Sequence, residues 1–204
     1  KHLADNQLLI NRYSINVVGK HPTISYTELR TLVKPNPNKK LFFIRFKLWA
    51  YYRYKNKQTK FNSWLNKHFG EEPSFYNVIT LDEITHKMGR YINNVGYFHS
   101  KVDYSTKFKN KVVNIKFTIH PSEPYRISSI KYDISDTLVK RFFYEKIKNT
   151  LVKQGDIYNA YTFDDERDRI TEQLRNTGYF YFNRNYIQFV LDSNLMKHKM
   201  NVDL

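Results

Sequence analysis

Apolar residues in the first half of the chain alternate between the spacing of a strand and the spacing of a helix. The pattern predicts a strand, a short helix, a longer helix and two strands, in that order, over 8–18, 25–32, 81–95, 99–108 and 112–119. In the last of these strands every second residue from Val113 to Ile119 is apolar. This alternation predicts that one face of the strand is buried against a core.

The second half of the chain repeats this order of elements. Its predicted strand, two helices and two strands cover 125–134, 136–153, 163–177, 185–191 and 200–204. A short hinge, Pro-Ser-Glu-Pro at Pro121 to Pro124, separates the two halves. We therefore predict two α+β modules in tandem, over 7–120 and 123–204, and expect the second to be cut short in its last strand.

Both modules carry the same motif where the longer helix gives way to a strand. Asn94 to Phe98 reads Asn-Val-Gly-Tyr-Phe, and Asn176 to Phe180, about 82 residues later, reads Asn-Thr-Gly-Tyr-Phe. Glycine at this position is typical of the left-handed residue that ends a helix. We predict that these five-residue corners are structural and that they depend on Gly96, Tyr97, Phe98, Gly178, Tyr179 and Phe180.

Two helix starts of the first module carry capping signals. Ser25 stands three residues before Glu28, and Thr80 stands three residues before Glu83, which is the spacing of a capping box. We therefore predict Ser25 and Thr80 as N-caps. In the second module a run of carboxylates falls in the predicted first helical turn, where negative charge offsets the helix dipole, at Asp164, Asp165, Glu166 and Asp168. We prefer this interpretation to a catalytic carboxylate cluster.

A basic and aromatic insertion at about 39–75 lies between the two helices of the first module. No Asp or Glu occurs between Glu28 and Glu71, and the apolar spacing predicts one or two amphipathic helices. Lysine and arginine among Trp and Tyr suit a membrane interface or another anionic surface. The candidate contacts are Arg45, Lys47, Trp49, Lys55, Lys57, Lys60 and Trp64. For the two Trp residues we favour the alternative, which is packing against their own module.

Composition narrows the possible functions. The formal net charge of +15 favours an anionic partner, such as nucleic acid, lipid or acidic protein, although codon bias towards A and T would give a similar composition. Apolar residues make up 41% of the chain, which excludes a disordered tail. The lack of Cys excludes disulfides, thiolate metal sites and a Cys nucleophile. The sequence has no run of about 18 apolar residues, so it predicts no transmembrane helix.

Signals of catalysis are weak. The histidines lack the spacing of metal ligands, and the chain has neither a phosphate-binding loop nor a nucleophile elbow. We therefore predict no enzymatic activity and no cofactor. Basic residues among aromatics also describe proteins that bind single-stranded nucleic acid. That function stays an alternative, although no nucleic-acid recognition signature is present.

Units of this order and of about 80 residues resemble POTRA domains, the polypeptide-transport-associated modules. In that family the second helix ends in a similar Gly-Tyr-Phe step. The run from Pro121 to Ile127 resembles the joint between successive units. The whole chain is similar to the periplasmic N-terminal part of the BamA/TamA outer-membrane assembly superfamily. The stretch from Pro35 to Tyr52 looks most like TamA-type lipoproteins of Bacteroidetes.

This resemblance implies a fold and a setting. Each module would have a β-α-α-β-β order, with a three-stranded mixed sheet and two helices on one face. The chain would face the periplasm of a Gram-negative bacterium, as the arm of an outer-membrane β-barrel that follows it. The implied function is assembly or translocation, through binding of unfolded outer-membrane protein strands or of a TamB-like partner anchored in the inner membrane. The arm of a dedicated secretion transporter is the alternative within this architecture.

The edges of such sheets are the candidate binding sites. An open edge accepts an added strand by main-chain pairing, unless the edge is covered or strongly twisted. We expect the second strand of each sheet to be an edge. The candidate residues are Val102 and Tyr104 in the first module, and Tyr186, Gln188 and Val190 in the second.

Overall fold

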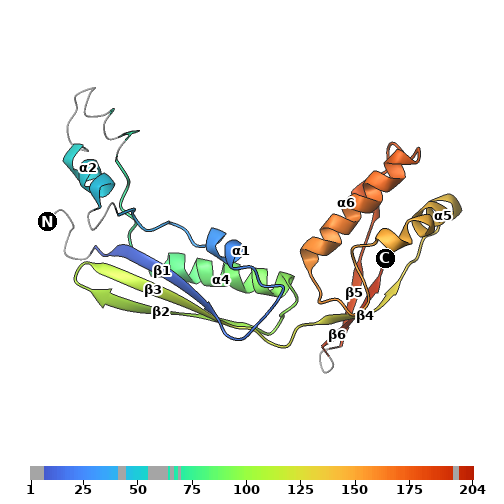
Figure 1. Cartoon of the computed structure of the whole chain (residues 1–204), viewed down its shortest axis with the longest axis horizontal. Helices are drawn as coiled ribbons and strands as arrows, with labels where there is room; N and C mark the ends of the chain where they lie inside the picture. Colours follow the sequence, from blue (N-terminus) through green and yellow to red (C-terminus); the bar gives the residue numbers. More distant parts are fainter. Residues whose placement is uncertain (1–6, 41–44, 55–63, 65–66, 69, 195–197) are drawn as a thin grey trace. The chain divides into compact units, whose positions relative to one another are not determined.

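The first sheet is built around the strand whose alternation is clearest in the sequence. The computed structural model describes residues 7–40, 45–54, 64, 67–68, 70–194 and 198–204 (Figure 1). In it, β1 (Leu9–Val17), β2 (Lys101–Lys109) and β3 (Val112–His120) form a sheet of order β1-β3-β2, with β1 parallel to β3. The predicted buried face of β3 is confirmed, because its four alternating apolar side chains are at most 1% exposed.

Two helices of the first module pack beside this sheet. Helix α1 (Tyr26–Thr31) is capped as predicted, since the Ser25 hydroxyl accepts a hydrogen bond from the Glu28 backbone N–H at 3.3 Å. Helix α4 (Val78–Asn94) buries a stripe that includes Ile84, Met88 and Ile92. Figure 1 shows both helices on the same side of the sheet. In the insertion, helix α2 (Phe46–Tyr54) lies within the segment predicted to hold one or two amphipathic helices, and it buries Leu48 and Ala50 while Phe46 and Trp49 stay exposed.

The predicted start of the longer helix is wrong. Helix α4 begins at Val78, and the Asn77 side chain accepts a hydrogen bond from the Ile79 backbone N–H at 2.8 Å. Thr80 therefore lies inside the helix and caps nothing. The Asn side chain satisfies one of the first free N–H groups, so the helix begins one turn before the capping-box signal.

The second sheet has the same topology. It is formed by β4 (Arg126–Lys131), β5 (Val190–Asn194) and β6 (Lys199–Asp203) in the order β4-β6-β5. Strand β4 is parallel to β6, and β5 is antiparallel to it. Helices α5 (Thr137–Glu145) and α6 (Ala160–Asn176) pack with this sheet through two apolar clusters, one around Tyr125 and one around Phe143. The predicted α+β class with two three-stranded mixed sheets is confirmed.

Two predicted elements of the second sheet's module differ in the structure. The helix predicted over 136–153 ends at Glu145 and is followed by the short 3-10 helix η1 (Ile147–Asn149). The strand predicted over 185–191 begins late, because 3-10 helix η2 (Arg184–Tyr186) occupies its first part. The Asn183 side chain accepts a hydrogen bond from the Asn185 backbone N–H at 2.9 Å and stabilises this turn instead of a strand.

By its contacts the chain divides into two compact units. Unit 2 consists of Gly19–Ile24, Arg90–Lys101 and Pro121–Leu204, and the other described residues form unit 1. The last turn of α4 and the corner that follows it therefore belong to unit 2. The module boundaries predicted from the sequence, 7–120 and 123–204, follow the repeat of elements rather than the contacts and stay a prediction.

Candidate protein-docking surfaces

Strand β2 forms one edge of the first sheet, because β3 is its neighbour on one side and no described strand lies on the other. It is nine residues long. The carbonyl groups of Lys111, just before β3, and of Ile119 on β3 accept hydrogen bonds from Leu9 N and Val18 N, both at 3.0 Å. The backbone N–H and C=O groups of the odd-numbered residues of β3 therefore point towards β1, and those of the even-numbered residues point towards β2.

This alternation also fixes which backbone groups of β2 point outward. A two-residue turn joins β2 to β3, so Lys109 pairs with Val112 and the two strands are antiparallel. The odd-numbered residues of β2 then bond to β3. The N–H and C=O groups that point away from the sheet belong to Val102, Tyr104, Thr106 and Phe108. The two predicted edge residues of the first module, Val102 and Tyr104, thus lie on this outward set.

Apolar side chains border one end of this edge. The Phe108 side chain is 56% exposed, and its ring meets that of Tyr76 edge-on with centroids 5.6 Å apart. Val78 and Ile79, which open α4 two and three residues after Tyr76, are 47% and 69% exposed. Four residues before Phe108 on the same face of the strand, the Tyr104 hydroxyl donates a hydrogen bond to Asp82 Oδ1 of α4 at 3.1 Å. A strand added to β2 would therefore meet apolar surface next to α4.

Lysines limit what this edge can pair with. Lys101, Lys107 and Lys109 of β2 are exposed. Lysine on an edge strand discourages unspecific pairing with other sheets, since a second basic strand is repelled. The edge therefore favours strands that bring acidic or uncharged side chains to these positions.

The opposite edge of the first sheet, on β1, is partly covered. Ile10 N donates to Ser74 O at 2.9 Å, and Tyr76 N donates to Leu8 O at 2.8 Å, so residues 74–76 cover its first part. The remaining part lines a groove of about 670 Å³ with side chains of and after α1. Burial raises the pKa of Tyr13, which lines this groove, to about 12. Its hydroxyl is buried without a hydrogen-bond partner among the described residues. Sequence reasoning missed this groove, because no local motif marks it.

The edge of the second sheet is shorter than predicted. Strand β5 has five residues and borders β6 alone among the described strands. Val190 opens it and is 61% exposed. Tyr186 lies in η2 and Gln188 lies between η2 and β5, so the prediction that these two residues belong to an edge strand is wrong. Burial of the Ile187 side chain and the turn capped by Asn183 hold this segment out of the sheet.

The basic insertion is described only in part. Lys55, Lys57 and Lys60 lie outside the described residues. Arg45 Nη2 donates to Asn11 Oδ1 at 3.0 Å, and burial lowers the pKa of its guanidinium, so Arg45 ties the insertion to β1. Lys47 is exposed, and Trp49 stacks on Phe46 with ring centroids 5.6 Å apart.

Both Trp side chains of the insertion remain open to solvent. Trp49 is 47% exposed and Trp64 is 49% exposed. Packing against their own module, which the sequence favoured, therefore covers only about half of each ring system. An aromatic side chain that is half exposed next to cations keeps the candidate anionic or membrane contact open as a prediction.

The first Gly-Tyr-Phe corner is covered. Gly96 takes a φ of +100°, and the Tyr97 side chain is fully buried. Phe98 packs against Tyr125 and Tyr158, with ring centroids at 5.0 and 5.4 Å. Tyr125 N donates to Gly96 O at 2.9 Å. All of these residues belong to unit 2.

The second corner has the same backbone and different surroundings. Gly178 takes a φ of +105°, and Tyr179 packs edge-on against Phe142 with ring centroids 6.3 Å apart. Phe180 is 75% exposed and Tyr181 is 96% exposed. Phe180 therefore does not anchor its corner in the way that Phe98 does.

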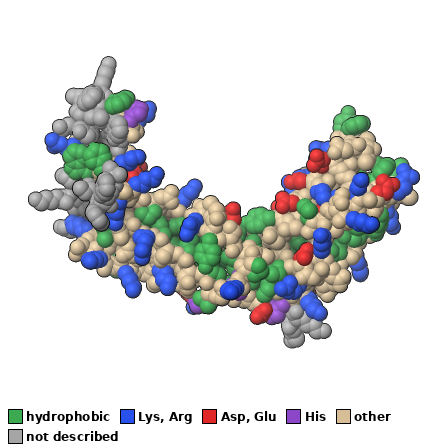
Figure 2. All heavy atoms as spheres, viewed as in Figure 1, with side chains coloured by type: hydrophobic (Ala, Val, Ile, Leu, Met, Phe, Trp, Pro, Cys, Tyr) green, Lys and Arg blue, Asp and Glu red, His purple; other side chains and the backbone are tan. Residues whose placement is uncertain are grey.

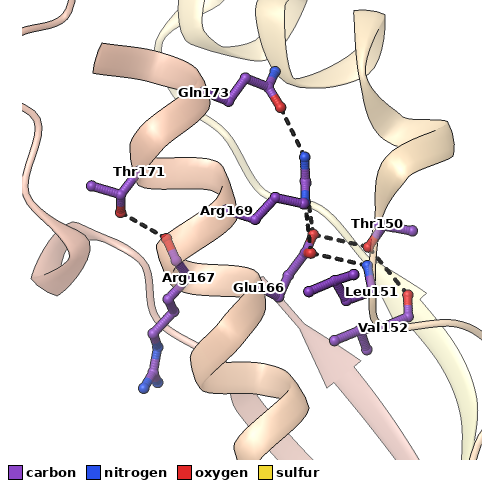
Figure 3. Close-up of polar contacts among 8 residues, drawn as sticks. All are labelled: Thr150, Leu151, Val152, Glu166, Arg167, Arg169, Thr171 and Gln173. Carbon is purple, nitrogen blue, oxygen red and sulfur yellow. Dashed lines mark hydrogen bonds and ion pairs between the residues drawn. The ribbon is translucent and has the colours of Figure 1, made fainter. Parts of the chain in front are cut away.

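The carboxylate run of the second module forms ion pairs. Figure 3 shows Glu166 and Arg169 pointing toward each other from α6, with Glu166 accepting from Arg169 Nε and Nη2, both at 2.8 Å. The Glu166 side chain, 2% exposed, also accepts from Thr150 Oγ1 at 2.9 Å and Leu151 N at 3.0 Å.

Two other members of the run, Asp164 and Asp168, form ion pairs at the surface. Asp164 contacts Arg167 and Arg184, and Asp168 contacts Arg184. Because α6 begins at Ala160, none of the carboxylates lies in its first turn, and the predicted dipole role is wrong. The run binds α6 to its neighbours instead.

Charge, membrane and metal criteria add three findings. On the face drawn in Figure 2, Lys and Arg side chains are spread over both units and do not gather in one patch. No helix within the described part of the chain is long and apolar enough to cross a membrane. No group of three or more His, Asp or Glu side chains that could hold a metal ion occurs among the same residues.

Comparison with known proteins identifies the class of the second module. Residues 125–203 match the family model described as "POTRA: Surface antigen variable number repeat". These residues hold all three strands and both helices of the second sheet's module, so the second module is similar to this family over its whole length. No curated protein matches the chain.

Solved structures of POTRA-containing proteins resemble the chain at low identity. They include BamA from Haemophilus ducreyi lacking POTRA domains 1-3 (14% identity, 72% of this chain and 26% of that chain, TM-score 0.36). POTRA3-5 of BamA from Haemophilus influenzae gives 10% identity over 100% of this chain and 98% of that chain, with a TM-score of 0.33. CdiB from Escherichia coli gives 13% identity over 100% of this chain and 28% of that chain, with a TM-score of 0.34. These TM-scores carry no argument beyond the topology already described. The chain spans about a quarter of the length of the first and last of these proteins.

Proposed function

We propose that the chain is an arm of two POTRA modules that binds extended polypeptide segments at the edge of its first sheet. The observation that carries this proposal is the nine-residue edge strand β2, whose outward backbone groups lie beside exposed apolar side chains. The POTRA match of residues 125–203 and the same order of elements in the first module support it. The binding is non-covalent and needs no cofactor.

The proposed setting is the periplasmic side of a Gram-negative outer membrane. There the arm would precede a β-barrel of the BamA/TamA kind and act in assembly or translocation of proteins. Its partners would be unfolded outer-membrane protein strands or a TamB-like periplasmic protein. The TamA-type character of the stretch from Pro35 to Tyr52 belongs to this proposal as well.

The edge also predicts the kind of strand that it binds. Successive side chains of an added strand alternate between the face next to α4 and the opposite face of the sheet. Phe108 and Ile79 favour apolar side chains on the face next to α4, whereas the lysines of β2 favour acidic or uncharged side chains elsewhere. Alternating apolar and polar residues are also the pattern of strands that form outer-membrane barrels. Each main-chain hydrogen bond adds about 1 kcal/mol net, so the contact is weak and reversible.

The test is photocrosslinking in cells with the full-length protein. A probe at Tyr104 should give a discrete adduct with an envelope protein, and a probe at Lys116, an exposed residue of the central strand β3, should not. Thr106→Pro removes one outward N–H at the centre of the edge, where proline is tolerated, and should abolish the adduct. Thr106→Ala keeps that N–H and should preserve it. An adduct that survives Thr106→Pro would contradict strand addition at β2.

The insertion supports a second candidate function, contact with an anionic membrane surface. The half-exposed Trp49 and Trp64 are the observation that favours it, and they are the only two Trp residues of the chain. Intrinsic fluorescence therefore reports this region directly. Vesicles containing phosphatidylglycerol should shift the emission to shorter wavelength, and vesicles of phosphatidylcholine alone should not. Unchanged emission with both vesicles would remove this candidate.

A further inference from the structure

Strand β1 carries one extra residue, Asn11, where its pairing with β3 is interrupted. Ile10 pairs with Val113 and Arg12 pairs with Asn114, so Asn11 forms a β-bulge between them. The Asn11 side chain donates from Nδ2 to Asn114 Oδ1 at 2.6 Å. A bulge redirects a side chain, and bulges occur often beside functional sites. Here the bulge leaves the amide oxygen of Asn11 available to groups outside the sheet.

Two cationic side chains meet at this amide oxygen. Lys40 Nζ donates to Asn11 Oδ1 at 2.6 Å, and Arg45 Nη2 donates to the same atom at 3.0 Å. Arg45 Nε is buried without a hydrogen-bond partner among the described residues, and burial lowers the pKa of the guanidinium. Like charges repel at such a separation, and a neutral oxygen offsets little of the cost of removing a cation from water. The two cations therefore lack a compensating negative charge.

A hollow of about 570 Å³ opens at the same place. It is lined by Asn11, Arg12, Asn38, Lys40 and Asn114, so it has a cation on β1 as well. The Arg12 side chain forms no hydrogen bond or ion pair with any described residue, and neither does Asn114 Nδ2. The hollow thus offers N–H donors from three side chains, and no carboxylate lines it.

The acidic side chain that comes near this region is engaged elsewhere. The carboxylate oxygens of Glu71 accept from Lys39 N at 3.3 and 3.4 Å. The insertion contributes no other Asp or Glu before Glu71. Within the described part of the chain, no carboxylate forms an ion pair with Arg12, Lys40 or Arg45. The negative charge that these three cations lack has to come from a ligand.

We propose that the β1 bulge and the side chains around it form a binding site for the phosphate group of an anionic ligand. Arginine binds phosphate through paired N–H donors, and lysine binds it as a point charge. Arg12 and Lys40 would contact the phosphate, and Asn114 Nδ2 would donate a further hydrogen bond. Arg45 would hold Asn11 in place and add positive charge.

Phosphate suits this site better than a carboxylate because of its charge. A phosphate ester carries about 1.5 to 2 negative charges at neutral pH, and it has three strong acceptor oxygens. It therefore compensates more of three clustered cations than a single carboxylate does. The site goes beyond the proposed binding of polypeptide strands, since it lies on β1 and β3 and takes a different class of ligand.

Inorganic phosphate is the first probe of the site. Added to the isotope-labelled chain at constant ionic strength, it should shift the backbone amides of Asn11 and Arg12 and the side-chain amide of Asn114 until they saturate. Arg12→Gln should weaken the affinity about tenfold, because it removes a charged hydrogen-bond donor. The matched control is Lys116→Gln. Lys116 is an exposed cation of β3 that does not line the hollow, so its loss should change the affinity less than about twofold.

A second variant supplies the missing charge from the chain itself. Asn11→Asp places a carboxylate where Lys40 and Arg45 meet, and the amide of Asn114 can turn to donate to it. The variant should unfold at a higher temperature than the parent chain without phosphate, and it should lose the phosphate-induced shifts. A variant that unfolds at a lower temperature and still binds phosphate would contradict the inference.

Two further probes separate the possible sources of the phosphate group. Glycerol 3-phosphate carries the group in soluble form, and phosphatidylcholine vesicles containing phosphatidic acid carry it at a lipid surface. Binding of the first that depends on Arg12 assigns a soluble phosphate ester. Binding of the vesicles alone that depends on Arg12 assigns a lipid headgroup.

Two results would overturn the inference. One is the same set of shifts with sodium chloride at equal ionic strength, which would mean that the cations respond only to screening. The other is an equal response of Arg12→Gln and Lys116→Gln to every probe. Neither result bears on strand binding at β2, because no substituted residue belongs to that strand.

Discussion

The two modules share one order of elements but leave different surfaces open. The first has a nine-residue edge strand, β2, and a covered corner in which Tyr97 is fully buried. The second has a five-residue edge strand, β5, and an open corner in which Phe180 is 75% exposed. Since the helices and turns of the two corners match, the difference arises from what lies against them. The two modules thus expose different surfaces, an edge strand in the first and an aromatic corner in the second.

The helices that precede the corners also differ at one buried position. Ile84 of α4 and Glu166 of α6 occupy the same place in the repeat, and both are at most 2% exposed. The first module fills this position with an apolar side chain, and the second with a carboxylate paired to Arg169. The same fold therefore tolerates either packing or a satisfied ion pair at this place.

Removing the buried carboxylate should have the largest effect. Glu166→Ala removes the carboxylate that accepts from Arg169, Thr150 and the Leu151 N–H, which should lower the free energy of unfolding by about 3–5 kcal/mol. The double variant Glu166→Ile with Arg169→Lys, which places the first module's Ile84 and Lys87 at the two positions, should lose less than the single variant. Urea unfolding followed by circular dichroism measures both. A double variant that is less stable than the single one would contradict the equivalence of the two positions.

Alanine at the two corner glycines should separate the covered corner from the open one. Gly96→Ala adds a backbone clash to the strain of a positive φ and should lower the free energy of unfolding by about 3 kcal/mol. Gly178→Ala adds the strain alone and should cost about 1 kcal/mol. The same urea series measures the pair. Equal losses would mean that the contacts around Gly96 contribute nothing.

Truncating the two phenylalanines should give a smaller difference in the same direction. Phe98→Ala removes ring contacts with Tyr125 and Tyr158 and should cost about 2 kcal/mol. Phe180→Ala removes an exposed ring and should change stability by less than about 0.5 kcal/mol. Thermal unfolding of both variants against the parent chain measures this. A loss at Phe180 as large as that at Phe98 would show that its corner is covered.

The prediction with the smallest effect on stability at neutral pH concerns Tyr13 of the first sheet. Burial raises the pKa of Tyr13 from 10.0 to about 12, and β4, the first strand of the second sheet, contains no Tyr. The folded state then holds the phenolic proton more tightly than the unfolded state. The free energy of unfolding is therefore unaffected by this group below pH 10 and falls as the pH rises towards 12.

Tyr13→Phe should remove that alkaline loss and change neutral stability little, because the hydroxyl has no partner among the described residues. Trp fluorescence follows unit 1, since Trp49 and Trp64 both belong to it. Urea midpoints measured at rising pH should fall less steeply in the variant than in the parent. Parallel curves would contradict the assignment to Tyr13.

The sequence predicted the elements that keep a regular apolar spacing over many residues. It failed where a single side chain determines where an element begins or whether it forms. Strand β3 and helices α4 and α6 bury regular stripes, so their existence followed from spacing. The start of α4 and the loss of the strand at Tyr186 depend on Asn77 and Asn183, whose side chains bond to nearby backbone N–H groups. Such local bonds compete with any pattern of burial.

The candidate sites were predictable only in part for a different reason. That the second strand of the first sheet is an edge followed from the strand order once a three-stranded sheet was expected, whereas Thr106 and Phe108 of its outward set were not predicted. The surroundings of Phe98 and Phe180 could not be predicted, because the local sequences of the two corners are nearly the same. What covers each corner comes from residues far along the chain, which no local pattern specifies.

The most direct test of the central claim is an NMR titration of the isotope-labelled chain with a synthetic strand. The peptide would have about ten residues that alternate between apolar and acidic, the length of a membrane-spanning barrel strand. The account predicts that the largest shifts fall on the backbone amides of Val102, Tyr104 and Thr106, and that Thr106→Pro removes them. Shifts confined to β5 and the open corner, or no shifts at millimolar peptide, would contradict it.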